Sequence, residues 1–126
     1  LYSSTWMFNA YGHSQSSIST SMYDKINELL DYLHSSYNTK ITSSSIEQLL
    51  SVNFDYLNRI FKKQTGTTIF AYLNQHRLEH AMQLLLTTTL SLSEIAELTG
   101  FSDEYYFNRF FKKRVGITPA KYRKAG

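Results

Sequence analysis

The sequence has no cysteine, one proline and five glycines, and each scarcity narrows the possible folds. A chain without cysteine has neither a disulfide framework nor a thiolate metal site, and it suits a reducing compartment such as the cytoplasm. So few helix-breaking residues favour helices over a sandwich of many short strands. No apolar run approaches the roughly 20 residues of a membrane-spanning helix, and no signal peptide is recognisable.

Patterns typical of catalytic and cofactor sites are also missing. We find no glycine-rich phosphate loop, no nucleophile motif and no acidic pair at metal-ligand spacing, so we expect neither an enzyme nor a cofactor. His76 and His80 stand one helical turn apart, a spacing that can bind zinc. Because no third ligand lies at a suitable spacing, we expect a histidine pair without metal.

Basic residues are concentrated in two stretches that contain no acidic residue. The formal net charge is only +3, but residues 58–78 hold four basic side chains and residues 105–126 hold seven. Two separated basic stretches indicate two contacts with a polyanion. Two solvated helix faces would give the same composition.

The first 21 residues differ from the rest of the chain. The segment SQSSISTS at 14–21 is polar and typical of a linker, whereas Trp6, Met7 and Phe8 are apolar. Since the chain starts at Leu1 rather than at a methionine, we expect residues 1–21 to be a linker or a remnant of an upstream domain.

From Tyr23 onward, apolar residues recur at helical spacing and predict an all-α fold of about seven helices. Serine, asparagine and aspartate before these segments, and glycine after several of them, predict where the helices begin and end. The predicted helices cover about 23–36, 43–50, 54–65, 68–87, 92–99, 103–115 and a short final segment from Pro119.

A repeat is the strongest internal signal. NRIFKKQTGTT at 58–68 and NRFFKKRVGIT at 108–118 agree at seven of eleven positions, at an offset of 50. A short helix precedes each copy at an offset of 49, so the difference of one residue falls in the turn. This pattern predicts two helix-turn-helix subdomains, residues 22–67 and 88–126, joined by a linker helix at 68–87.

The helices at about 54–65 and 103–115 are the predicted recognition helices. When Leu57 and Phe61 of the first and Phe107 and Phe111 of the second face the core, the opposite faces are polar and basic. Arginine matches guanine and asparagine matches adenine in the major groove, so these faces suit base reading. The predicted base-reading residues are Asp55, Asn58, Arg59, Tyr105, Asn108 and Arg109.

Asp55 is unusual in this set because a carboxylate repels phosphates. It fits if it accepts from cytosine N4 or pairs with Arg59 one turn later, and the sequence leaves both open. Cations beside the predicted base readers, and the hydroxyl-rich starts of the preceding helices, suit phosphates. The predicted phosphate contacts are Ser43, Ser44, Lys62, Lys63, Ser91, Ser93, Lys112, Lys113 and Arg114.

The predicted linker helix contributes spacing and a buried cation. Twenty residues give a rod of about 30 Å, which would hold the two recognition helices about one turn of B-DNA apart. Arg77 lies among its apolar residues. We expect Arg77 to form a structural ion pair, with Asp103 as the candidate, rather than to touch DNA.

Residues 23–123 resemble the AraC/XylS-type transcription regulators. The segment SLSEIAELTGFSDEYYFNRFFKKRVGITPAKYR at 91–123 is similar to the family signature almost throughout, and Tyr72, Arg77 and Leu78 match in the linker helix. The resemblance implies two helix-turn-helix subdomains that bind adjacent major-groove segments of duplex DNA as a monomeric unit. It also implies transcriptional control in bacteria, usually activation, with a sensor or dimerisation domain upstream.

Two residues of the first subdomain depart from the family pattern. Glu47 stands where alanine is usual, and we expect it to point outward. Ser51 stands where glycine is common, and we expect it to adopt the turn conformation with strain.

Two other classes of function would also use features of this sequence. A helical protein-interaction module would use the basic faces to bind an acidic partner, and a single-strand binder would stack bases on the many aromatic rings. Most rings fall on predicted core positions, so packing explains them better. Duplex DNA is the predicted partner, RNA polymerase is a further candidate, and no membrane is expected.

Overall fold

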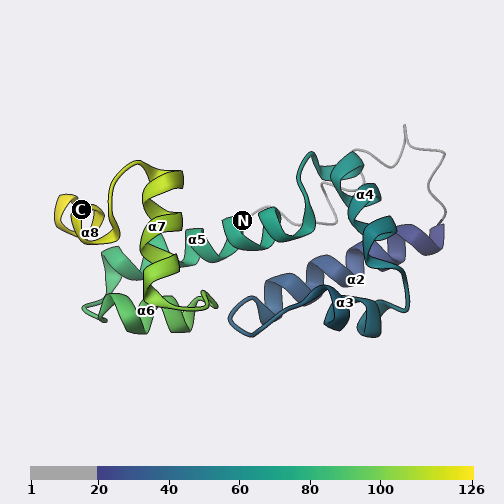
Figure 1. Cartoon of the computed structure of the whole chain (residues 1–126), viewed down its shortest axis with the longest axis horizontal. Coiled ribbons are helices and arrows are strands. Elements are labelled where there is room, and N and C mark those ends of the chain that lie inside the picture. The colour runs from purple at the N-terminus through teal and green to yellow at the C-terminus, as the bar shows by residue number, and fades with distance from the viewer. Residues whose placement is uncertain (1–19) are drawn as a thin grey trace. The chain divides into compact units, whose positions relative to one another are not determined.

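The computed structural model describes residues 20–126, and this part of the chain is entirely helical, without strands (Figure 1). The helices are α2 (Thr20–Ser36), α3 (Ser43–Leu50), α4 (Phe54–Thr65), α5 (Ile69–Thr87), α6 (Leu92–Leu98), α7 (Glu104–Val115) and α8 (Pro119–Ala125). The prediction of an all-α fold with two helix-turn-helix pairs is confirmed. The prediction for residues 1–21 lies outside the described residues, except that α2 already begins at Thr20.

Side-chain caps set most of the helix starts. Asn53 and Asp103 accept from the third residue of α4 and α7, and Thr118 does the same for α8 ahead of Pro119. The serine-rich start of α3 is capped one residue earlier than the serines, by Thr42. The sequence therefore predicted these boundaries to within a few residues.

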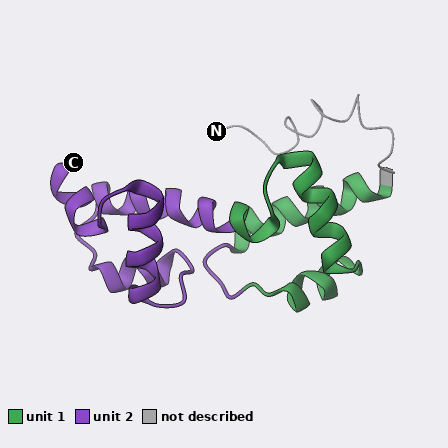
Figure 2. Cartoon of the chain, turned by 45° about the horizontal axis from the view of Figure 1, so that its top comes forward, with its two compact units in different colours: residues 1–36, 41–72 green, residues 37–40, 73–126 purple. Residues whose placement is uncertain are grey.

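The chain forms two compact units (Figure 2). Among the described residues, unit 1 comprises 20–36 and 41–72, and unit 2 comprises 37–40 and 73–126. Helix α5 is shared, because its first turn belongs to unit 1 and the rest to unit 2. Each unit therefore has one helix-turn-helix pair, α3–α4 or α6–α7, packed on a part of α5.

The core of unit 1 is formed by the apolar faces of its four helices. Leu57 and Phe61 of α4 are fully buried, as the helical spacing predicts, and the ring of Tyr72 meets that of Phe61 edge-on. The other buried apolar residues are Ile26, Leu29, Leu30, Leu33, Ile41, Ile46, Leu50 and Ile69.

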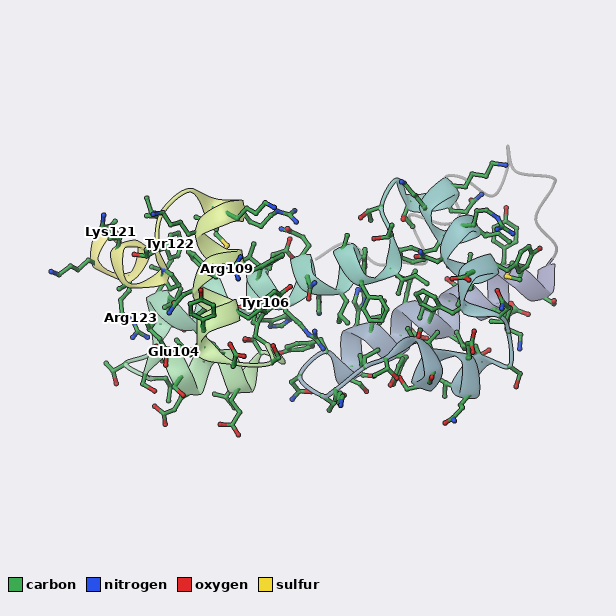
Figure 3. All side chains as sticks on the ribbon, in the orientation of Figure 1. Glu104, Tyr106, Arg109, Lys121, Tyr122 and Arg123 are labelled. Atoms are coloured by element: carbon green, nitrogen blue, oxygen red, sulfur yellow. The ribbon has the colours of Figure 1, made fainter. Side chains whose placement is uncertain are left out.

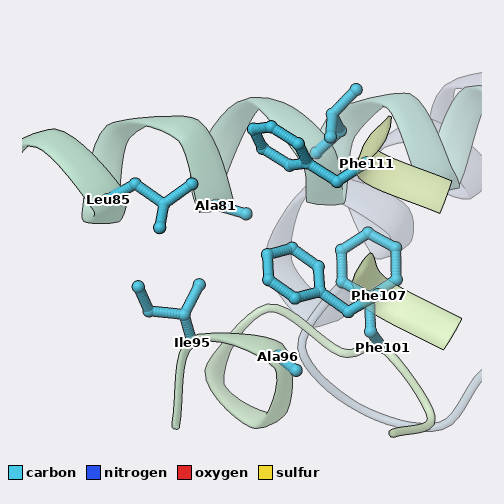
Figure 4. Packing of buried hydrophobic residues seen from close by; sticks show 8 residues of the cluster. Ala81, Leu85, Ile95, Ala96, Phe101, Phe107 and Phe111 are labelled. Atoms are coloured by element: carbon cyan, nitrogen blue, oxygen red, sulfur yellow. The ribbon is translucent and has the colours of Figure 1, made fainter. Parts of the chain in front are cut away.

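Unit 2 repeats this arrangement with more buried phenylalanine rings (Figure 4). Phe107 and Phe111 of α7 are fully buried beside Phe101, and Tyr122 of α8 meets Phe111 edge-on, as Tyr72 meets Phe61 in unit 1. Fully burying one such ring stabilises the fold by about 1.5–3 kcal/mol. Burial of these rings fixes the rotation of α7, and so decides which of its side chains face solvent.

Candidate nucleic-acid interface

Helix α4 presents a charged face because its apolar face is fixed in the core. Asn53 caps its first turn, Gly66 ends it in the left-handed conformation at φ 87°, and Leu57 lies inward. The exposed face carries Arg59 and, at the end of the helix, a lysine pair. The predicted exposure of Asp55, Arg59, Lys62 and Lys63 is confirmed.

Helix α7 repeats this construction in unit 2. Asp103 caps it, Gly116 ends it at φ 100°, and Arg109 projects from the exposed side (Figure 3). The predicted exposure of Tyr105, Arg109, Lys112, Lys113 and Arg114 is likewise confirmed. Each recognition helix therefore offers one arginine near its middle and a cationic end.

An exposed ring supports each of these arginines. The guanidinium carbon of Arg59 lies 5.6 Å from the ring centre of Tyr56, and that of Arg109 lies 5.5 Å from the ring centre of Tyr105. Cation–π attraction of this kind is worth about 0.5–1 kcal/mol at exposed sites. Because the attraction restrains the guanidinium while its N–H groups can still donate, both arginines are held in place with free donors.

Tyrosine residues on the recognition helices were partly overlooked by sequence reasoning. Tyr56 and Tyr106 are 44% and 38% exposed, although neither was among the predicted base readers. Tyr106 stacks on Phe110, and both line a cavity of about 530 Å³ beside Arg109. The signal was present in the sequence, since these two tyrosines extend the repeat.

The carboxylate of Asp55 does not pair with Arg59. Within residues 20–126, the structure records no hydrogen bond or ion pair for this carboxylate, and the Arg59 guanidinium lies over Tyr56 instead. Of the two roles that the sequence left open, the intrahelical pair is therefore excluded.

The two asparagines are placed differently from the prediction. The side-chain oxygen of half-buried Asn58 accepts from the backbone N–H of Ile69 at 2.8 Å, at the start of α5. The side-chain oxygen of Asn108 is buried, and within the described chain no donor reaches it. The residue of unit 2 that corresponds to Ile69 is Pro119, which has no N–H to donate.

The prediction that Asn58 and Asn108 point outward toward bases is therefore wrong. A bidentate pair with adenine requires both the amide oxygen and the amide nitrogen. The oxygen of Asn58 is engaged, and that of Asn108 is turned away from solvent. The bond to Ile69 explains the orientation of Asn58, and Pro119 explains why the oxygen of Asn108 lacks the corresponding donor.

The starts of α3 and α6 differ in charge. Ser43 and Ser44 are exposed behind the cap of Thr42, and the capping box closes with the uncharged Ser45. In α6 the box closes with Glu94, whose carboxylate accepts from the N–H of Ser91 at 2.9 Å.

Those bonds have an electrostatic consequence. Hydrogen bonds from the backbone and then the hydroxyl of Ser91 lower the pKa of the Glu94 carboxyl, and burial opposes them. The start of α6 thus already carries a negative charge, although Ser93 beside it is exposed. The start of α3 suits a phosphate better than that of α6.

The side chain of Arg114 already has partners within unit 2. Its guanidinium donates to the side chain of Gln75 at 2.9 Å and lies 5.6 Å from the ring centre of Phe110. Lys112 and Lys113, by contrast, are exposed and have no such partner among residues 20–126. The lysines are the stronger candidates for phosphate contacts.

Two arginines of the basic stretches have structural partners. Arg77 donates to the main-chain carbonyls of Tyr37 and Thr39 at 2.7 and 2.9 Å, and burial lowers the pKa of its guanidinium. It does not pair with Asp103, which caps α7, so the predicted ion pair is wrong although the structural role holds.

Arg123 repeats this use of main-chain carbonyls. It donates to Leu85, Leu90 and Thr88 at 3.0, 2.7 and 3.1 Å, and so ties α8 to the end of α5 and the segment after it. Sequence reasoning did not identify this role, because charge alone does not distinguish an arginine that binds main-chain carbonyls from one that contacts phosphate.

Glu47 is the clearest correction in unit 1. It was expected to point outward, but it is half-buried and its carboxylate accepts from the N–H of Phe54 at 2.6 Å. It therefore caps the recognition helix together with Asn53. Ser51, which ends α3, has φ 54° and so adopts the expected left-handed turn conformation, which is strained for a residue with a side chain.

The histidines of α5 form an aromatic cluster. The two Nε2 atoms of His76 and His80 lie 3.2 Å apart, and the ring of Tyr37 stacks on His80 at 4.2 Å. In the described part of the chain, no group of three potential ligands could hold a metal ion.

Comparison with known proteins decides the family. A family profile described as "Helix-turn-helix domain" matches residues 48–125. A transcriptional regulator with an AraC-type DNA-binding domain from Chromobacterium violaceum superposes with a TM-score of 0.71 at 26% identity, over 84% of this chain and 95% of that one. The chain belongs to the AraC-type helix-turn-helix family. Domains of this family bind DNA in transcription regulators.

Other relatives are more similar to this chain in sequence. The C-terminal domain of the two-component response regulator yesN from Fusobacterium nucleatum is 40% identical, with a TM-score of 0.75, over 79% of this chain and 98% of that one. The Msm operon regulatory protein of Streptococcus mutans is 34% identical over 110 residues, 87% of this chain and 39% of that protein. The chain spans 22–39% of the length of the first curated relatives it matches. No helix among residues 20–126 is long and apolar enough to cross a membrane.

Proposed function

We propose that this AraC-type domain recognises a specific duplex by placing α4 and α7 in two adjacent major-groove segments. The observation that carries the proposal is the matched pair Arg59 and Arg109. Both are exposed at corresponding positions of the repeat, and each lies over a tyrosine ring. Exposed Ser43 and Ser44, with Lys62, Lys63, Lys112 and Lys113, are proposed as the phosphate contacts that set the register.

The proposal extends to the whole protein. Curated relatives are longer than this chain, which supports a sensor or dimerisation domain elsewhere in the full-length protein. We propose that the full-length protein acts in the bacterial cytoplasm with RNA polymerase as a further partner, and the family resemblance favours activation. A helical module that binds an acidic protein through the same basic faces is the alternative.

Binding to duplex DNA at several salt concentrations distinguishes these two functions. Affinity for DNA should fall steeply as salt rises, with a slope of about 0.9 per phosphate neutralised. Enrichment of bound sequences from a random duplex library should then give two half-sites, spaced by about one helical turn. Binding without any sequence enrichment would leave only electrostatic attraction and would contradict the proposal.

Alanine variants assign the contacts. Arg59→Ala and Arg109→Ala should each cost on the order of 1–3 kcal/mol on the selected site and relax the preference at one base pair. Lys113→Ala should weaken all sequences alike and reduce the salt slope by about one phosphate. Lys40→Ala removes the same charge outside both basic stretches and serves as the control. Wild-type binding by both arginine variants would refute the base-reading role.

A further inference from the structure

Asp55 and Tyr105 occupy corresponding positions in the two recognition helices. Each is the second residue of its helix, and each lies one turn before the arginine that we assign to base reading. Both are exposed, Tyr105 by 71%. The repeat therefore places a carboxylate in unit 1 where unit 2 has an aromatic ring.

The carboxylate of Asp55 is available for a ligand. Over the whole described range it has no recorded donor, and Arg59, the cation one turn later on the same helix, is held over Tyr56. A carboxylate only accepts hydrogen bonds, so in the major groove it requires an exocyclic amino group. Adenine N6 lies beside the acceptor N7, which repels a carboxylate, whereas cytosine N4 has no neighbouring acceptor on its own base.

The spacing between Asp55 and Arg59 fixes where that cytosine should lie. Side chains four residues apart on a helix are separated by about 5–6 Å at Cβ, and one base pair rises by about 3.4 Å. The cytosine should therefore lie within about two base pairs of the guanine contacted by Arg59. The arginine charge there also offsets the repulsion between the carboxylate and the phosphates.

We propose that Asp55 selects a cytosine in the first half-site, and that the two recognition helices therefore read different sequences. Tyr105, at the corresponding position, presents a ring that packs on a thymine methyl group and offers no carboxylate to a cytosine. The site is then an asymmetric pair of half-sites, although the two helices share most of their repeat. This inference rests on the proposed function, because it assigns a base to one of its reading helices.

A structural role of Asp55 is the rival explanation. A carboxylate in the first turn stabilises a helix through the dipole without touching DNA. Glu104 is the matched control, because it is the exposed first-turn carboxylate of α7 and lies one residue before the position of Tyr105. At 100° per residue, Glu104 points about 100° away from Tyr105 and about 140° away from Arg109.

The test compares enrichment from a random duplex library for the wild-type chain and for Asp55→Ala, Asp55→Asn and Glu104→Ala. Arg59→Ala first marks the guanine of the first half-site. Asp55→Ala should lose the neighbouring cytosine preference by about tenfold, while the second half-site is retained. It should also bind unrelated duplex more tightly, because a negative charge near phosphates is removed. Asp55→Asn should shift the preference toward adenine, and Glu104→Ala should leave every base preference unchanged.

Each other outcome overturns the inference in a recognisable way. An unchanged first half-site in Asp55→Ala shows that the carboxylate reads no base. Equal losses of thermal stability and of affinity for every sequence, in both Asp55→Ala and Glu104→Ala, show a helix-dipole role. A wild-type chain that enriches no sequence refutes the proposed function itself, which is a different result from an enriched site without the cytosine.

Discussion

In unit 1 the turn between α3 and α4 is closed by Ser51, whereas the corresponding turn of unit 2 is closed by Gly100. Ser51 is exposed and holds φ 54°, so its side chain has room but its backbone is strained. Gly100 holds φ 90°, and a Cβ there would lie 2.2 Å from the carbonyl oxygen of Tyr37 and 2.7 Å from Nε of Arg77. The same turn thus tolerates a side chain in one unit and excludes it in the other.

The recognition helices also begin differently. In unit 1 the carboxylate of Glu47 and the amide of Asn53 both accept from the first turn of α4. In unit 2 the residue that corresponds to Glu47 is Ala96, which is 2% exposed and belongs to the core with Phe107. One position therefore serves as a polar cap in the first unit and as packing in the second.

The joint after each recognition helix is the third difference. In unit 1 the side chain of Asn58 accepts from the N–H of Ile69. In unit 2 the corresponding residue is Pro119, which has no N–H to donate to Asn108. Pro119 favours the start of α8 because its ring fixes φ near the helical value. It has no N–H, however, so the side-chain oxygen of Asn108 is left without a donor. Corresponding positions of the repeat therefore contribute differently to the stability of the two units. Exchanging the residues at these positions tests each contribution.

The largest effect is expected from placing the serine of unit 1 into the turn of unit 2. Gly100→Ser should lower the free energy of unfolding by about 3 kcal/mol, because the new Cβ overlaps backbone and the left-handed conformation disfavours a side chain. Urea unfolding followed by far-UV circular dichroism measures the change.

The reciprocal variant is the control for that exchange. Ser51→Gly relieves the positive φ without any overlap, and should raise the free energy of unfolding by up to about 1 kcal/mol. If both variants shifted stability in the same direction, the two turns would not differ in the way that their geometry indicates.

Removing the two asparagines should give unequal losses. Asn58→Ala leaves the N–H of Ile69 without its acceptor and should cost about 1–3 kcal/mol. Asn108→Ala removes an acceptor that has no donor and should change stability by less than about 0.5 kcal/mol. Chemical unfolding of both variants makes the comparison.

A double-mutant cycle sharpens this result. Pro119→Ala supplies an N–H at the start of α8, so Asn108→Ala should become costly in that background, by about 1 kcal/mol. Equal losses for both asparagines in the parent chain, or no coupling between Asn108 and position 119, would refute the account of the joint.

The sequence predicted what depends on periodicity and local capping. The apolar spacing fixed the buried faces of α4 and α7, and hence the exposure of Arg59 and Arg109. Asn53 and Asp103 were recognisable as caps because an N-cap acts on the turn beside it. The repeat, read as two helix-turn-helix pairs, identified the recognition helices.

The errors concern polar side chains whose partners are distant in the chain. Asn58 bonds to a residue eleven positions away, and Glu47 to one seven positions away. Arg77 reaches carbonyls 40 and 38 residues away. Helical periodicity places a side chain on a face, but it does not show which backbone group of another element that face will meet.

A smaller effect is expected at the start of α4. Glu47→Ala introduces the residue of unit 2 and removes the carboxylate from the N–H of Phe54, which should cost about 1 kcal/mol. The exposed Glu28→Ala on α2 is the control for loss of a carboxylate. Hydrogen exchange of the Phe54 amide should accelerate in Glu47→Ala only, and unchanged protection would show that the carboxylate is not a cap.

The smallest expected effect is a difference in acid sensitivity between the capping boxes of α3 and α6. Ser91 lowers the pKa of Glu94 below its ordinary value of 4.5, so the folded state binds this proton less readily than the unfolded chain. The stabilisation is then present above about pH 4.5 and is lost as pH falls through the lower, folded-state pKa. The box of α3 closes with Ser45, which does not titrate, so only unit 2 should show this acid loss at its capping box. Amide exchange at the start of α6, measured down this range, should accelerate in the wild-type chain relative to α3. Glu94→Gln should remove the dependence on pH, and an unchanged acid response in that variant would assign the loss to another carboxylate.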